Sequence, residues 1–71
     1  MSVAKVIELT SSSNESFEDA IQQGVSRAAK TLKNVQGAWI KEQQVSIENG
    51  RITGYRVNMM VTFVLDGDVD G

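Results

Sequence analysis

Cysteine, histidine and proline are all absent from the 71 residues of this chain. Without cysteine the chain can form neither a disulfide nor a thiolate metal site. Without histidine it lacks the residue that most often acts as a general base near neutral pH, so no serine has its usual activating partner. A carboxylate of unknown position is the only alternative base, and we therefore do not expect an enzyme.

A strong charge of one sign and long apolar runs are also missing. The formal net charge is −2, whereas a nucleic-acid-binding domain is expected to carry a basic face. No apolar run approaches the length of a membrane span, and no basic segment followed by an apolar stretch opens the chain. We expect a single domain over residues 1–71 with no nucleic-acid or membrane partner and, by default, a cytoplasmic location.

The size of the chain points to self-association. A domain this short buries only about 60% of the surface of its unfolded chain, so its own core gives marginal stability. Disulfides and thiolate metal sites, which stabilise many small domains, are excluded by the composition. Association of identical chains is the remaining source of stability, and we expect a homo-oligomer.

Residues 51–65, RITGYRVNMMVTFVL, predict the central strand of a sheet. The odd positions from 55 to 65 are apolar, and the polar residues occupy even positions, as in a strand with one buried face. At about 3.3 Å per residue this strand would span roughly 50 Å, whereas a globule of this chain length is about 30 Å across. The strand must therefore curl strongly or reach a neighbouring subunit.

Residues 4–10 predict a short first strand, and residues 17–32 predict an amphipathic helix. The hydroxyl-rich run between them supplies the N-cap, for which Ser12 and Ser13 are the candidates. Acidic residues precede basic ones along the helix, in agreement with its dipole. Gly24 costs about 1 kcal/mol in helix propensity relative to alanine, which a close approach of helix to sheet would explain. The apolar stripe comprises Phe17, Ala20, Ile21, Gly24, Val25, Ala28 and Leu32.

Residues 34–37 predict a turn, residues 38–48 a second strand, and Asn49-Gly50 a type I′ hairpin turn. The fold class is therefore α+β, with the order β-α-β-β and a three-stranded antiparallel sheet wrapped around one long helix. An uninterrupted ladder from this turn fixes the register. It pairs Glu48 with Arg51, Ile47 with Ile52, Val45 with Gly54, Gln43 with Arg56, Lys41 with Asn58 and Trp39 with Met60.

These pairs share the sheet face that one helix cannot cover, and that face is partly apolar. Trp39 and Met60 lie at one end of it, and Val45, Ile47 and Ile52 lie at the other. An exposed apolar patch marks an interaction surface, unless the twisted sheet curls and buries it. We expect the patch to drive self-association.

Trp39 is the candidate binding residue, because an aromatic plane beside polar donors can hold a flat ligand by stacking and hydrogen bonding. An aromatic residue at a subunit interface is the alternative. The expected neighbours on the same face are Lys41, Gln43, Arg56 and Asn58.

Asp66, Asp68 and Asp70 have the spacing that opens a calcium loop. The chain has no later ligands to close such a loop, so a solvated acidic tail is the preferred interpretation. We predict no metal site.

The order of the elements, together with KVIELTSSSNESFEDAI, SRAAKTLKNV and GYRVNMMVTFVLDG, resembles the dodecins over nearly the whole chain. The resemblance implies a sheet wrapped around its helix, twelve subunits in a hollow shell and no catalytic activity. It also implies a flavin, riboflavin or FMN, bound between subunits. In the family the flavin ring stacks on a tryptophan and is hydrogen-bonded by a glutamine of the last strand.

Both of these positions differ in this chain. In an ungapped alignment through SRAAKTLKNVQGAWIKEQ the family's tryptophan falls on Gly37, and Trp39 lies two residues later, about 7 Å along the strand. The family's glutamine falls on Arg56, which could pair with a phosphate. Two functions stay open. One is a flavin-storing shell that uses Trp39, Arg56, Gln43, Lys41 and Asn58; the other is a flavin-free shell holding ions through Glu42, Glu15 or the C-terminal aspartates.

Overall fold

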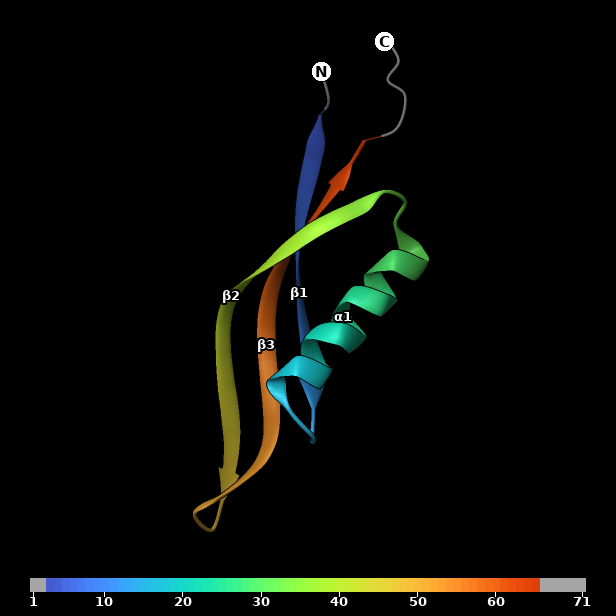
Figure 1. The fold of residues 1–71 in the computed structure, drawn as a ribbon. Helices are drawn as coiled ribbons and strands as arrows, with labels where there is room; N and C mark the ends of the chain where they lie inside the picture. Colours follow the sequence, from blue (N-terminus) through green and yellow to red (C-terminus); the bar gives the residue numbers. More distant parts are fainter. Residues whose placement is uncertain (1–2, 66–71) are drawn as a thin grey trace.

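A computed structural model describes residues 3–65. The elements are β1 (Ala4–Ser13), α1 (Phe17–Thr31), β2 (Val35–Glu48) and β3 (Arg51–Val64) (Figure 1). The strands form one antiparallel sheet in the order β1-β3-β2, which confirms both the fold class and the central position of β3. The hairpin of β2 and β3 extends past the start of α1, and the molecule is elongated, with principal extents of 56 × 19 × 13 Å.

The N-cap of α1 is Ser16, whose Oγ accepts a hydrogen bond from the backbone N–H of Asp19 at 2.9 Å. The prediction of Ser12 or Ser13 was wrong because the hydroxyl run continues β1 and pairs with β3 as far as Ser13. Ser13 has a different role. Its Oγ accepts from the backbone N–H of Glu15 at 2.9 Å and donates to Asp19 Oδ2 at 2.6 Å, so it connects the end of β1 to the first turn of α1.

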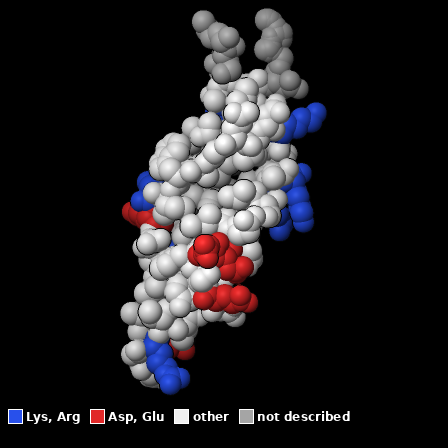
Figure 2. Space-filling model, viewed as in Figure 1, with Lys and Arg blue, Asp and Glu red and all other residues white. Residues whose placement is uncertain are grey.

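The charges of α1 follow its dipole as predicted. Glu18 and Asp19 lie in the first turn and Lys30 in the last turn, and Figure 2 shows acidic side chains near the start of the helix and basic ones near its end. Such placement stabilises a helix by about 0.3–1 kcal/mol per charge at an exposed terminus. None of the described residues forms a helix long and apolar enough to cross a membrane.

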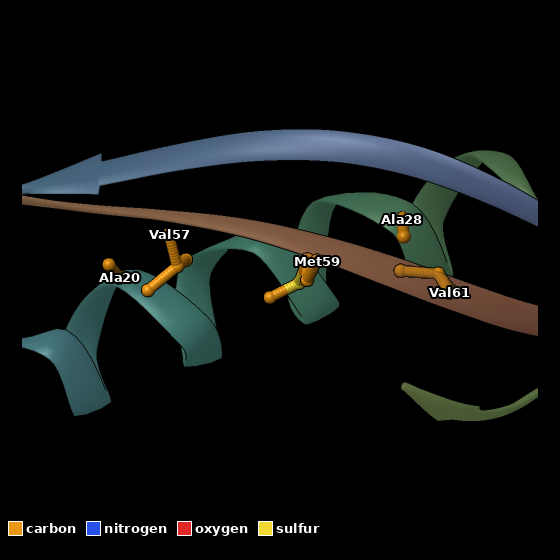
Figure 3. Packing of buried hydrophobic residues seen from close by; sticks show 5 residues of the cluster. All are labelled: Ala20, Ala28, Val57, Met59 and Val61. Carbon is orange, nitrogen blue, oxygen red and sulfur yellow. The ribbon is translucent and has the colours of Figure 1, made fainter. Parts of the chain in front are cut away.

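The core lies between α1 and β3 (Figure 3). Small residues on the helix allow a close approach to the sheet. A Cβ added to Gly24 would lie 3.1 Å from Ser11 Cβ and 3.3 Å from Met59 Cε, which confirms the predicted reason for a glycine in the apolar stripe. The buried hydrophobic residues are Ala20, Ala28, Val57, Met59 and Val61.

The predicted register of the β2-β3 hairpin is correct at its two ends. The turn is as expected, and the ladder is again in the expected register where β2 passes the middle of β3. The confirmed pairs are Glu48–Arg51, Ile47–Ile52 and Trp39–Met60, and Ile40–Met59 and Ala38–Val61 continue the same ladder.

The middle of the hairpin is offset from the prediction by one residue. Thr53 of β3 and Lys41 of β2 have no opposing residue, so each is the extra residue of a bulge-like irregularity. The two extra residues lie on different strands, and their offsets therefore cancel at Trp39. The predicted pairs Val45–Gly54, Gln43–Arg56 and Lys41–Asn58 were wrong. The observed pairs are Ser46–Gly54, Val45–Tyr55, Gln44–Arg56, Gln43–Val57 and Glu42–Asn58.

The offset places the apolar end of the hairpin on the helix side of the sheet, which corrects its predicted position on the uncovered face. Val45 lies opposite Tyr55, whose ring packs edge-on against Phe17 with the centroids 5.1 Å apart. Opposing residues share a face, and alternation puts Ile47 and Ile52 on the same side as Val45. Because α1 begins at Phe17, it does not cover them, and they are 62% and 54% exposed. We call Ile47 and Ile52 the apolar tip.

The hairpin turn gives a first testable prediction. Asn49 and Gly50 have φ of 53° and 74°, as a type I′ turn requires. Gly50→Val should lower the free energy of unfolding by about 1–2 kcal/mol, because at positive φ a Cβ lies too close to the following carbonyl oxygen. Urea denaturation at equal subunit concentration measures the change.

Gly37→Val is the matched control for this substitution. A Cβ at Gly37 meets nothing within 4 Å, and the residue is not one of those with positive φ. Its unfolding free energy should stay within about 0.5 kcal/mol of the parent, as at most surface positions. Equal losses in the two variants would contradict the assigned turn.

Candidate ligand-binding site

The sheet face opposite α1, which we call the open face, is not covered by any described residue. Opposing residues on the three strands share a face and form rows across it. Each row takes one residue from β1, one from β3 and one from β2. The rows, read toward the hairpin turn, are Val6–Thr62–Gly37, Glu8–Met60–Trp39, Thr10–Asn58–Glu42 and Ser12–Arg56–Gln44.

Trp39 is the only tryptophan of the chain, and it is 52% exposed on the open face. It shares its row with Met60 and Glu8. The preceding position on the same face of β2 is Gly37, where an added Cβ would meet nothing within 4 Å. The indole therefore presents an accessible aromatic plane bordered by bare backbone, which suits the stacking of a flat ring.

A chain of hydrogen bonds crosses the open face beside Trp39. Thr10 Oγ1 donates to Asn58 Oδ1 at 3.1 Å, and Asn58 Nδ2 donates to Glu8 Oε2 at 3.4 Å. Lys41 Nζ lies 3.5 Å from the same carboxylate oxygen and forms an ion pair with it. Lys41 reaches this oxygen from its bulged position in β2, across the central strand.

The hydrogen-bond chain engages the side chains of two predicted binding residues, Lys41 and Asn58, within the protein. Both ends of the Asn58 side-chain amide are engaged within the protein, and the Lys41 ammonium is paired with Glu8. The ion pair is about half exposed, so it adds little stability, about 0–1 kcal/mol. We infer that these residues fix the polar border of the site.

Arg56 lies two rows from Trp39 and is exposed. No ion pair of Arg56 exists within residues 3–65, so its guanidinium is available to a ligand. Its neighbour across the strands is Gln44, whereas Gln43 lies opposite the buried residue Val57 and so is on the helix side. The structure thus brings Trp39, Lys41, Asn58 and Arg56 together on one face and separates Gln43 from them.

The described carboxylates that could bind an ion do not lie together within a single subunit. Glu8 and Glu42 are on the open face, while Glu15 lies before α1 on the far side of the sheet. Within residues 3–65 no three aspartate or glutamate side chains come close enough to hold an ion. Asp66, Asp68 and Asp70 are outside the described residues.

The fold defines a small α+β module whose open face carries one aromatic plane with a polar border. The profile of the Dodecin family matches residues 3–66. The calcium dodecin of Mycobacterium tuberculosis is 36% identical over 64 residues, which are 89% of this chain and 89% of that protein. The dodecin of Thermus thermophilus is 36% identical over 64 residues, which are 90% of this chain and 93% of that protein. The chain belongs to the dodecin family.

Solved structures agree with this assignment. An arginine-to-alanine variant of the T. thermophilus dodecin has a TM-score of 0.88 at 34% identity, covering 94% of this chain and 100% of the variant. A dodecin from Streptomyces davaonensis has 0.87 at 30% identity, covering 93% and 97%. The calcium dodecin of M. tuberculosis, described with a novel calcium-binding site, has 0.78 at 28% identity, covering 97% and 99%. Dodecins are small binding and storage proteins that form oligomeric shells.

Proposed function

We propose that this chain assembles into a twelve-subunit shell that stores a flavin, riboflavin or FMN, without catalysing a reaction. The observation that carries the proposal is the half-exposed Trp39 on the open face, beside the ordered polar chain of Thr10, Asn58, Glu8 and Lys41. An isoalloxazine ring needs an aromatic surface for its plane and polar groups for its edge. The open face offers both in adjacent rows.

The displaced tryptophan lies closer to the second departure from the family pattern, Arg56. Trp39 is one row closer to Arg56 than a tryptophan at position 37 would be. Met60, which faces Trp39, and Arg56 are four residues apart in β3, about 13 Å along the strand. A three-ring ligand with its side chain can bridge that distance, so the shift of the aromatic residue brings it within reach of the free cation.

Titration of the assembled protein with riboflavin tests the proposal. The ring should stack on the indole and be quenched, so the flavin fluorescence should stay low while binding sites fill and rise linearly once they are saturated. Absence of quenching at high micromolar riboflavin would contradict flavin storage.

A flavin-free shell that holds calcium is the second candidate. It is favoured by the 36% identity to a protein named calcium dodecin and by two carboxylates, Glu8 and Glu42, on the open face. Calorimetric titration with calcium chloride distinguishes the two functions. Heat of calcium binding without flavin quenching would favour the second candidate, since carboxylate oxygens are the ligands that calcium prefers.

Arg56 gives a prediction about ligand preference. A guanidinium pairs with phosphate through two parallel hydrogen bonds, so FMN should bind more tightly than riboflavin. Because Arg56 is exposed, the preference should be about 1 kcal/mol or less, up to roughly fivefold in Kd, and it should shrink at high salt. Parallel titrations with both ligands at two salt concentrations measure it.

Arg56→Leu should remove the preference for FMN and leave riboflavin binding nearly unchanged. The matched control is Arg51→Leu, which removes a guanidinium at the hairpin turn, opposite Glu48. If both variants keep the preference, the phosphate does not contact Arg56.

A further inference from the structure

The open face carries one amide that neither the alternating sequence pattern nor the family pattern indicates, namely Gln44. An uninterrupted ladder would place Gln43 opposite Arg56. The extra residues Thr53 and Lys41 offset the middle of the hairpin, so that Gln44 takes this place. Ser12 of β1 completes the row, in which a hydroxyl, a guanidinium and an amide lie side by side.

Arg56 alone is an incomplete partner for a flat heterocyclic ring. A guanidinium only donates hydrogen bonds, whereas the carboxamide of glutamine has one oxygen that accepts and one nitrogen that donates. The edge of an isoalloxazine alternates carbonyl oxygens with an N–H group, so it requires an acceptor from the protein as well as donors. A buried N–H without an acceptor costs about 1–3 kcal/mol.

The other groups of the open face are less suited to accept from this N–H. The Asn58 amide is engaged by Thr10 and Glu8, and Gln43 is on the opposite side of the sheet. Glu42 is charged, and covering an ionised carboxylate with a ring is costly because the charge loses its hydration. Gln44 is neutral and exposed, and it shares its row with the free cation Arg56.

We infer that Gln44 binds the ring edge of the ligand, with its Oε1 accepting from the ring N–H while Arg56 donates to the phosphate of FMN. This inference rests on the proposed function. The amide that the family pattern places on the last strand is then supplied by the neighbouring strand, in the same row. Loss of glutamine at position 56 is offset by a glutamine across the strands.

Gln44→Met and Gln43→Met test the inference, because they make the same chemical change at adjacent positions on opposite faces. Methionine keeps the length of the side chain and removes the amide. In riboflavin titrations of the assembled protein, Gln44→Met should raise Kd by about tenfold, the cost of an unsatisfied N–H. Gln43→Met should stay within about twofold of the parent, as expected for a group outside the site. Light scattering establishes that each variant has the parent's mass.

A riboflavin methylated at the ring N–H provides a second readout that a purely structural role would not change. The parent and Gln43→Met should bind it about tenfold more weakly than riboflavin, since the accepting oxygen loses its donor. Gln44→Met should bind both ligands equally. If the Met variant does not assemble, Gln44→Ala is used for the same comparison.

The outcomes separate this inference from the proposed function. If the parent quenches riboflavin but Gln44→Met behaves like Gln43→Met, Gln44 does not contact the ligand and the inference is wrong, while flavin storage stands. If the parent does not quench riboflavin, both are wrong.

Discussion

Light scattering of the purified protein should give a particle of about 92 kDa, twelve times the 7.7 kDa of one chain. A single chain has a small core, since the buried hydrophobic residues among residues 3–65 are two alanines, two valines and one methionine. Its apolar tip and Trp39 remain exposed. Isolated chains would therefore be only marginally stable. Apparent stability should also fall on dilution once the shell dissociates.

The apolar tip offers a sharp test of how the particle is held together. Burial of an isoleucine side chain contributes about 1.5–3 kcal/mol, and an unpaired charge in its place costs more. We expect Ile47→Glu to yield mainly species far smaller than the parent particle, because every subunit carries the change. Ser46→Glu is the control, since Ser46 is the adjacent residue on the opposite face, opposite Gly54.

Two results would contradict this view of assembly. A well-folded monomer as the main species of the parent at micromolar concentration would contradict the shell itself. A particle of unchanged mass and stability for Ile47→Glu would show that the apolar tip is not at a subunit contact.

Trp39→Ala should weaken riboflavin binding by about 1–3 kcal/mol, which is roughly 5- to 150-fold in Kd. The reason is the loss of the aromatic plane on which the ring stacks, while the polar border of Thr10, Asn58, Glu8 and Lys41 stays in place. Trp39→Phe keeps a smaller plane and should lose less. Fluorescence titrations of the three proteins measure the series.

The same series decides between the two interpretations of Trp39. If Trp39 is an interface aromatic rather than a binding residue, Trp39→Ala should lower the particle mass or its stability and leave the affinity of the remaining assembled protein unchanged. Equal riboflavin affinity in Trp39→Ala and the parent would contradict stacking on this residue.

The sequence predicted the elements that depend on local pattern. The alternation after Tyr55 identified the central strand, the three- and four-residue steps identified α1, and Asn49-Gly50 identified the turn. These signals suffice because side-chain periodicity and positive φ are properties of neighbouring residues. Counting residues from the turn correctly placed Trp39 opposite Met60. The count omitted the extra residues Thr53 and Lys41, but their offsets cancel before Trp39.

The errors have a common cause in tertiary pairing. Lys41 carries no local mark of a bulge, and the only local signal at Thr53 is the neighbouring Gly54. The offset between them moved Gln43 off the open face and Gln44 onto it. Likewise, all the hydroxyl residues before α1 can cap a helix. Only the pairing of β1 with β3 through Ser13 decides that Ser16 does so. The alternation therefore placed Trp39 and Arg56 on the open face correctly and placed the wrong glutamine beside them.

The bulge at Lys41 also bears on the chain before it assembles. β2 is an edge strand of 14 residues, and the unpaired backbone groups of a long, regular edge are a template for fibril growth. The ladder is irregular at Lys41 and again at Gln36, and a lysine at a twisted edge opposes the approach of another strand. The irregular edge therefore disfavours edge-to-edge strand pairing between newly synthesised subunits. These subunits associate instead through side-chain surfaces such as the apolar tip.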